Sequence, residues 1–361
     1  MVSLAGLHNG FTSRLLSVTT QLITNHPLLA TACLAAATGI PLFLSTFIRN
    51  FLFPPKSPFS ATSYPDLTSG EFTIPSEDGK RTISWAEYGT ASDNVLIYFH
   101  GIPGSRIIML ENLRQLCMGN GIRIIAPDRP GIGQTSPKPR GTKTADITSE
   151  NLAEILKHRG IKQVTLVGYS LGAVEALHFQ LLHSSMVKKT YLLGPAGFDT
   201  HADKLTERNL NAHWYAVYAP WVLNFFWIRN ARRMVSNPNF INVLIAQSPQ
   251  QDQSLLSEED RRLWRVSTAE TFAQGITGLR LGLLEGFGKK APNGWGFDMT
   301  KIPDPKKVTI YHGNLDKLSH LESARELAGL IGCELIEIED VGHFGIIRCG
   351  LERVFEKCRT V

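Results

Sequence analysis

The sequence predicts an α/β fold in which a mostly parallel sheet is flanked by helices. Short, unbroken apolar runs, such as VLIYF at residues 95–99, are typical of strands that are buried on both faces. Helical stretches separate these runs, as the right-handed crossovers between parallel strands require. The 361 residues are 43% hydrophobic, so the chain can form one domain with an insertion and a sizeable core.

The order of the elements follows from these patterns. Strands are expected at residues 71–74, 81–88, 95–99, 122–126, 164–167, 190–193, 308–311 and 334–338. Helices are expected at about residues 105–118, 149–159, 171–182 and 321–331, and from about Gly345 onward. The core of the α/β fold is therefore predicted to comprise residues 71–197 and 300–361.

The alternation of strands and helices stops at residues 198–299. This stretch looks helical, and it is too long for a connection and too apolar for a disordered one. It holds five of the six tryptophans, namely Trp214, Trp221, Trp227, Trp264 and Trp295. We predict a helical cap inserted over the C-terminal ends of the strands, where ligands bind in open α/β sheets.

The N-terminal segment, residues 1–53, contains a long uncharged run at residues 28–48. About 21 residues at about 1.5 Å each span roughly 30 Å, the thickness of the hydrocarbon core of a bilayer. The run therefore predicts a transmembrane helix, with a cleaved signal peptide or a helix lying in the membrane interface as alternatives. Residues 54–70 are rich in Pro, Ser and Thr, and they are predicted to form a linker.

The charges around the apolar run bear on where the predicted single-pass membrane protein lies in a cell. Arg14 precedes the apolar run, whereas Arg49 and Lys56 follow it, so the positive-inside bias favours a cytosolic catalytic body. A Ser/Thr-rich start without an acidic residue before Asp66 also resembles a mitochondrial address, so the endoplasmic reticulum and the mitochondrion both remain open.

Charge and cysteine spacing also bear on partners. The net charge of +5 comes without a long basic block, which does not favour a nucleic-acid partner. The five cysteines show no CxxC spacing, so free thiols are expected rather than a disulfide framework or a zinc site. Nothing in the sequence indicates the oligomeric state.

The strongest chemical signal is the segment Gly168-Tyr169-Ser170-Leu171-Gly172, between the expected strand VTLV and a helix. A turn this tight strains the backbone at Ser170, and the glycines on either side allow neighbouring chain to approach. The serine oxygen would then stand at a helix N-terminus, which favours developing negative charge. Ser170 is therefore the predicted nucleophile, the alternative being a serine that only caps the helix.

A serine hydroxyl needs a base to become a nucleophile. His343 follows the strand expected at residues 334–338, and Asp316 follows the strand expected at residues 308–311. Both lie just past strand C-terminal ends, so they can meet Ser170 at one edge of the sheet, with His343 as base and Asp316 as the acid that orients it. Asp340 is a rival acid, and each loop residue taken singly fits a structural role equally well.

Two backbone N–H groups are expected to bind the oxyanion of an acyl-transfer intermediate. One belongs to Leu171, directly after the nucleophile. The other belongs to Ile102 in the loop at residues 100–104, because Pro103 has no N–H to offer. A plain Gly/Pro turn is the alternative for this loop.

Four blocks together resemble the α/β-hydrolase superfamily, from about Glu71 to the C-terminus. They are HGIPGSR at residues 100–106, APDRPGIGQTS at residues 126–136, VGYSLGA at residues 167–173, and the pair HGNLD and VGHF ending at Asp316 and Phe344. The resemblance implies the α/β-hydrolase fold and a Ser-His-Asp enzyme, in the chain order Ser, Asp, His, that forms an acyl-enzyme without a cofactor or metal.

Two differences from the motifs of related families disfavour the reactions of those families. Ser170 stands where epoxide hydrolases and haloalkane dehalogenases carry Asp, and HGIPGSR differs from the HGGG loop of many lipases. The resemblance is therefore to the capped, esterase-like branch.

The cap sequence WYAVYAPWVLNFFW at residues 214–227 carries seven aromatic residues. They could pack against the sheet, line an apolar pocket or dip into a bilayer. We expect hydrolysis of a carboxylic ester, or of a thioester or amide, of a lipophilic small molecule. The alternatives are an acyltransferase that uses the same acyl-enzyme and a ligand-binding protein without catalysis.

Overall fold

The computed structural model describes residues 68–76, 79–89, 91–196, 207–246, 248–286 and 295–359. The predicted transmembrane helix at residues 28–48 lies outside these ranges, as does most of the predicted linker. Among the helices within them, none combines the length and the apolar character that crossing a bilayer demands.

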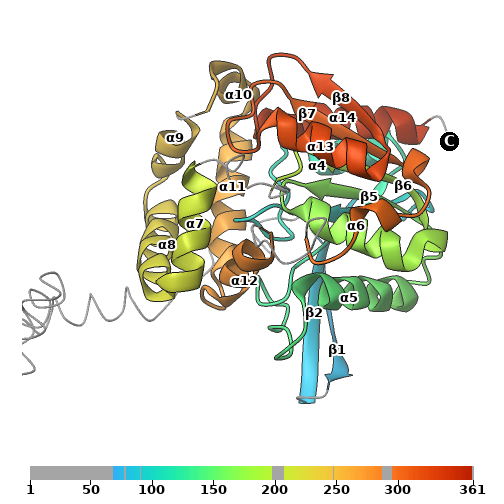
Figure 1. Ribbon diagram of the computed structural model, residues 1–361, viewed down its shortest axis with the longest axis horizontal. Coiled ribbons are helices and arrows are strands. Elements are labelled where there is room, and N and C mark those ends of the chain that lie inside the picture. The colour runs from blue at the N-terminus through green and yellow to red at the C-terminus, as the bar shows by residue number, and fades with distance from the viewer. Residues whose placement is uncertain are drawn as a thin grey trace, which may run out of the picture. The chain divides into compact units, whose positions relative to one another are not determined.

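Eight strands form one sheet in the order β1-β2-β4-β3-β5-β6-β7-β8 (Figure 1). The strands are β1 Thr68–Ser76, β2 Gly79–Gly89, β3 Val95–Phe99, β4 Arg123–Pro127, β5 Val164–Tyr169, β6 Val187–Leu193, β7 Val308–Gly313 and β8 Glu334–Ile338. β1 pairs with β2 and β2 pairs with β4 in antiparallel fashion, and all other neighbours are parallel. The mostly parallel sheet is thus present, with an antiparallel hairpin at one edge.

Helices cover both faces of this sheet. They are α4 Leu113–Gly119, α5 Thr144–His158, α6 Gly172–His183, α13 Leu321–Ile331 and α14 Gly345–Arg359. In β3, Val95, Ile97 and Phe99 pack into the core cluster that includes residues of α5, α6 and α13, whereas Leu96 and Tyr98 pack into the cluster that includes residues of α4 and α14. Alternating residues of a strand point to opposite faces, so an unbroken apolar run fills two cores at once.

Two expectations for local structure were wrong. The strand β1 begins at Thr68, inside the stretch assigned to the linker, because β1 pairs along its whole length with β2. The helix expected at residues 105–118 begins only at Leu113, because the preceding residues form a loop. In that loop Arg106 is fully buried and binds a charged partner, and this tertiary interaction outweighs helix propensity.

Six α-helices lie between β6 and β7 in the described part of the chain. They are α7 Glu207–Tyr218, α8 Pro220–Ser236, α9 Phe240–Ile245, α10 Gln250–Leu255, α11 Glu258–Thr271 and α12 Thr277–Gly286. They gather to one side of the sheet (Figure 1). We call them the cap helices; the limits predicted for core and cap remain predictions.

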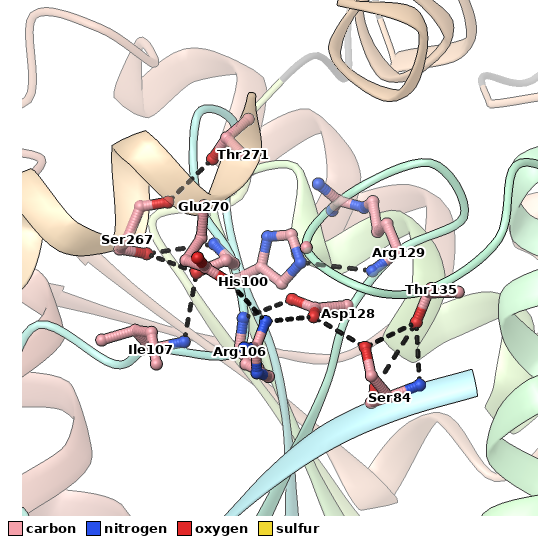
Figure 2. Close-up of polar contacts among 12 residues, drawn as sticks. Ser84, His100, Arg106, Ile107, Asp128, Arg129, Thr135, Ser267, Glu270 and Thr271 are labelled. Carbon is pink, nitrogen blue, oxygen red and sulfur yellow. Dashed lines mark hydrogen bonds and ion pairs between the residues drawn. The ribbon is translucent and has the colours of Figure 1, made fainter. Parts of the chain in front are cut away.

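A buried ion cluster joins cap helix α11 to the core (Figure 2). The Arg106 guanidinium lies 2.7 Å from Asp128 and 2.8 Å from Glu270 of α11. The backbone N–H of Arg106 also donates to Asp128, at 2.8 Å. Burial raises the pKa of Glu270, and only the neighbouring guanidinium counteracts this effect. The cluster therefore depends on Arg106 to keep two buried carboxylates together.

Neutral hydrogen bonds reinforce the same junction. The hydroxyl of Ser267 in α11 accepts from the N–H of Ser105 at 3.0 Å, and the hydroxyl of Thr271 donates to the carbonyl of Gly104 at 2.8 Å. In Figure 2, Ser267 and Thr271 lie on the same helix, beside the ion cluster. One face of α11 thus holds three consecutive residues of the loop that follows β3.

We expect Arg106→Met to lower the free energy of unfolding by about 3–5 kcal/mol, because it leaves two carboxylates buried without a cation. Urea denaturation measures this loss. Arg159→Met is the matched control, since Arg159 pairs with Glu87 at a half-exposed position, and it should cost no more than about 1 kcal/mol. Equal losses in the two variants would contradict the role given to the cluster.

Candidate active site

Ser170 lies at the sharp turn between β5 and α6, in the left-handed region with φ of 54°. Residues other than glycine seldom adopt this conformation, so surrounding contacts must hold it. The N–H of Ser170 donates to the carbonyl of Leu193 on β6 at 2.9 Å, and its carbonyl accepts from Ala173 and Ala196, each at 3.2 Å. The strained backbone turns the hydroxyl toward the space beyond the strand ends.

The two glycines of the segment are required by close packing. A Cβ at Gly172 would lie 2.1 Å from the carbonyl oxygen of Phe99 on β3, and a Cβ at Gly168 would lie 2.6 Å from the carbonyl oxygen of Gly172. Any side chain at either position would push β3, β5 and α6 apart. The spacing G-x-S-x-G therefore follows from the tightness of this turn.

The structure brings the three predicted side chains into hydrogen-bond contact. Nε2 of His343 lies 3.0 Å from Oγ of Ser170, and Nδ1 of His343 lies 2.7 Å from Oδ2 of Asp316. All three residues are buried. A carboxylate accepts from Nδ1–H, which leaves Nε2 with a lone pair directed at the serine hydroxyl.

Several groups keep Asp316 ionised. Burial by itself raises the pKa of this carboxyl, but the charge and hydrogen bond of His343, with the N–H of Ser319, outweigh burial and bring the pKa below its usual value. The second oxygen, Oδ1, accepts from the N–H groups of Leu318 and Ser319, each at 2.8 Å. Asp316 is thereby fixed in both charge and orientation.

The rival acid, Asp340, does not reach the imidazole nitrogen, because Asp316 occupies that position. The side chain of Asp340 is exposed, and its backbone has φ of 58°. Its N–H donates to the side-chain oxygen of Asn314 at 2.9 Å. Asp340 therefore belongs to the turn that leads into His343.

Three further residues hold this centre, and the sequence did not single them out. Tyr169 donates its hydroxyl to the carbonyl of His343 at 3.1 Å. His312 is fully buried, with Nε2 3.0 Å from the carbonyl of Ser319 and 3.6 Å from Asp316. Tyr169 belongs to the segment Gly168–Gly172 and His312 to the segment HGNLD, but only the folded chain shows their contacts.

The third residue, Asp252, comes from cap helix α10. Its carboxylate accepts from the N–H of Gly342 at 2.7 Å and from the N–H of Phe344 at 3.0 Å, on either side of His343. Asp252 is fully buried, and a Cβ at Gly342 would lie 2.6 Å from its oxygen. The cap thus fixes the backbone that carries the imidazole.

The predicted oxyanion loop lies against the serine. A Cβ at Gly101 would lie 3.0 Å from Cβ of Ser170, and both Ile102 and Leu171 line the same cavity as Ser170 and His343. The N–H of Ile102 belongs to the Gly101–Ile102 peptide, and in a planar peptide the carbonyl fixes the direction of the N–H. The groups that hold the Gly101 carbonyl therefore orient the predicted donor.

Those groups are His100 and Arg129. Nδ1 of His100 lies 2.9 Å from the Gly101 oxygen, and Nη1 of Arg129 donates to it at 3.5 Å. Burial, followed by the nearby charge of Arg129, lowers the pKa of His100 to about 3, so its ring is neutral at physiological pH. Its Nε2 accepts from the N–H of Arg129 at 3.4 Å, which leaves the proton on Nδ1 to bind the Gly101 carbonyl.

A buried ion pair fixes Arg129 in turn. Its Nε and Nη2 donate to the two carboxylate oxygens of Glu175 in α6, at 2.6 Å and 2.8 Å. This bidentate pair ties the loop after β4 to the first turn of the helix that follows Ser170. The pair thereby connects the peptide that carries the N–H of Ile102 to α6, and the other predicted donor, Leu171, lies at the start of the same helix.

A cavity of about 430 Å³ opens onto Ser170 and His343. Its remaining wall is apolar for the most part and comes largely from the cap, with Phe226, Trp227, Met234, Phe240, Trp264 and Phe272 among its side chains. No Lys, Arg, Asp or Glu lines it in the part of the chain that the structure describes. Its shape and surface suit an uncharged, lipophilic molecule.

No group of three or more His, Cys, Asp or Glu among the described residues is arranged to hold a metal ion. The described cysteines Cys117, Cys333, Cys349 and Cys358 are free, and Cys33 lies outside the described ranges. Burial raises the pKa of Cys117 and of Cys333 to about 12, so neither thiol ionises readily.

Known proteins resemble this chain in sequence and in fold. A 1-acylglycerol-3-phosphate O-acyltransferase of Arabidopsis thaliana is 25% identical over 271 residues, which cover 70% of this chain and 62% of that enzyme. The match thus spans less than two thirds of the relative.

Two solved structures share the fold. A bromoperoxidase from Bacillus anthracis matches with a TM-score of 0.57 and 19% identity, covering 80% of this chain and 98% of its own. An esterase from Thermogutta terrifontis matches with a TM-score of 0.53 and 19% identity, covering 81% and 97% of the two chains.

The match to a family model covers both the strands and the site. The model described as the alpha/beta hydrolase fold matches residues 94–348, from the start of β3 to beyond His343. This stretch is well over half of the 361 residues, and it contains the serine, aspartate and histidine that lie in contact. The chain therefore belongs to the alpha/beta hydrolase fold family.

Proposed function

We propose that this protein is a serine hydrolase that cleaves a carboxylic ester, or a thioester or amide, of a lipophilic molecule through an acyl-enzyme on Ser170. The observation that carries the proposal is the chain of contacts from Asp316 through His343 to Ser170, at 2.7 Å and 3.0 Å, facing an uncharged cavity. Hydrogen-bond distance between base and nucleophile is the geometry that general-base activation requires.

Acylation would use each group in a distinct role. Oγ of Ser170 attacks the carbonyl carbon as Nε2 of His343 removes its proton, and Asp316 stabilises the imidazolium that forms. The carbonyl oxygen becomes an oxyanion that accepts from the N–H groups of Ile102 and Leu171. His343 then returns the proton to the departing alcohol, and the acyl group remains on Ser170.

Deacylation repeats the same chemistry with water. His343 removes a proton from a water molecule, whose oxygen attacks the acyl carbon, and Ser170 leaves with the returned proton. Each step balances without a cofactor.

The cavity supports the assignment of a lipophilic substrate. Aromatic and aliphatic side chains of the cap make most of its wall, with Asn230 and Thr268 among its few polar groups. Burying an acyl chain there is favourable by roughly 0.8 kcal/mol per methylene. A charged head group would have to lie outside the cavity, because burying an unpaired charge is costly.

A second candidate is acyl transfer, favoured by the similarity to a 1-acylglycerol-3-phosphate O-acyltransferase. Hydrolysis and transfer share the acyl-enzyme and differ only in whether water or another alcohol attacks it. We expect free acid as the main product when an ester is offered together with a lipid alcohol, as measured by mass spectrometry. A new ester as the main product would favour transfer.

We also propose that residues 28–48 attach the protein to a membrane as a single span, with the catalytic body on the cytosolic side of the endoplasmic reticulum or of the mitochondrion. The uncharged run and the basic residues Arg49 and Lys56 after it support this proposal. Release of the protein from membranes by alkaline carbonate would exclude a span.

Ser170→Ala should abolish labelling by a fluorophosphonate probe and lower ester turnover by about 10³-fold or more, because it removes the hydroxyl that is hydrogen-bonded to Nε2 of His343. Gel fluorescence and steady-state kinetics measure these effects. Folded wild-type protein that takes up no probe would instead favour a ligand-binding protein without catalysis.

Asp252→Asn should lower kcat by about tenfold while leaving KM nearly unchanged, because an amide cannot accept from both N–H groups that flank His343. Asp340→Asn is the matched control, since this exposed acid lies three residues before His343 and makes no contact with its ring. Equal kinetics in the two variants would show that the cap does not position the imidazole.

A further inference from the structure

The outer surface of the cap carries a group of large exposed aromatic side chains, of which only Phe226 also lines the cavity at Ser170. They are Trp214, Tyr215 and Tyr218 on α7, and Trp221 and Phe226 on α8. Tyr218 is 72% exposed, Trp221 58%, Phe226 55% and Trp214 51%. We call these five residues the aromatic hairpin face. Contiguous apolar surface of this kind marks an interaction site more often than chance exposure does.

Helix geometry brings the three residues on α7 together. Trp214 and Tyr218 are four residues apart and so share one side of α7, with ring centroids 5.5 Å apart. The ring of Tyr215 also lies against Trp214, at 5.2 Å. Only Ala219 separates α7 from α8, so Tyr218 and Trp221 lie at the tip of a helical hairpin.

The fold does not need these side chains in its core. On α8, the residues that pack inward are Leu223, Ile228, Ala231 and Met234, and all of them are buried. α8 packs against α11, and α7 packs against α12. In Figure 1, α7 and α8 lie on the side of the cap that is farther from the sheet. The aromatic hairpin face is thus a second, outward surface of helices that already have a buried one.

Glu207, the first residue of α7, is the one acidic residue of the hairpin formed by α7 and α8. No Asp or Glu occurs between Arg208 and Gln251, whereas this stretch holds four arginines. Arg229 and Arg233 are exposed, and they follow Phe226 by three and seven residues on the same side of α8. The face is therefore aromatic at its tip and cationic along its flank.

The face also reaches the cavity. Phe226 is more than half exposed, and it lines the cavity that opens onto Ser170 and His343. A molecule leaving a surface that covers this face would meet the cavity wall at Phe226.

We infer that the aromatic hairpin face lies in the interface of a membrane that contains anionic lipids. Trp and Tyr prefer the level of the head groups, where the ring is in an apolar layer and its polar atom meets water. Arginines beside them bind lipid phosphates and are attracted by anionic head groups. A lipid surface matches both features, since the rings enter its interface while the arginines bind its head groups.

This contact goes beyond the proposed function and beyond the predicted anchor. It makes the cap itself a membrane-binding element, whether or not Ser170 is a nucleophile. It would place Phe226, which lines the cavity, against the lipid phase, so that a lipophilic molecule could reach the cavity wall without crossing water.

Tryptophan fluorescence tests the contact in the full-length protein. Residues 1–84 contain no tryptophan, so the predicted anchor contributes no signal, and Trp214 and Trp221 are the two exposed reporters. The protein is reconstituted into phosphatidylcholine vesicles with phosphatidylserine, with and without brominated acyl chains that quench tryptophan at short range. We expect clear quenching of the wild type.

Three double variants show which residues the quenching comes from. Trp214→Phe with Trp221→Phe should lose most of it, whereas Trp85→Phe with Trp295→Phe, a matched pair of buried residues, should leave it unchanged. Arg229→Gln with Arg233→Gln should reduce it toward the level seen without phosphatidylserine. Thermal unfolding shows that each variant is folded.

Two results would overturn the inference. The first is quenching that persists in the Trp214 and Trp221 double variant, since other tryptophans would then face the lipid. The second is a wild type without quenching, in which case the face is covered by protein. Sedimentation would then distinguish a second copy of the chain, which raises the mass of the complex, from residues 28–48 of the same chain, which do not.

Discussion

The left-handed backbone of Ser170 is the constraint on which the rest of the site depends. A strand that feeds directly into a helix must turn within one residue, and the strain of that turn is held by hydrogen bonds from β6 and by the absence of side chains at Gly168 and Gly172. The same turn puts the serine oxygen above the sheet and the N–H of Leu171 at the start of α6. One local geometry thus supplies both the predicted nucleophile and one predicted oxyanion donor.

Two cap helices contribute side chains that hold this centre in place. Glu270 of α11 shares Arg106 with the core, and Asp252 of α10 binds the backbone on both sides of His343. The two loops that must be aligned with Ser170 are therefore each tied to a cap helix. Because these ties are buried charges with few alternative partners, displacement of the cap would cost free energy and would disturb the centre at the same time. The position of the cap and the alignment of the imidazole are therefore physically linked.

Much of the core could be predicted from the sequence because its signals are local. The strand β8 and the helix α13 have the bounds that apolar periodicity predicts, and Ser170 is marked by the glycines that its own turn requires. The order of strands along the chain was also sufficient to place Asp316 and His343 at the edge of the sheet where Ser170 lies, since parallel strands end at a common edge. Family membership follows from the same segments.

The sequence by itself determined the fold class, the residues brought into contact and the apolar character of the cap. Only the tertiary structure decided which carboxylate meets the imidazole, that Arg106 belongs to a buried loop rather than a helix, and that His100 and Asp252 hold the segments beside Ser170. The physical reason is how far apart in the sequence the interacting residues lie. Turns and periodic patterns depend on residues close in sequence, whereas a buried hydrogen bond depends on two chain segments that approach one another only after the sheet and the cap have assembled.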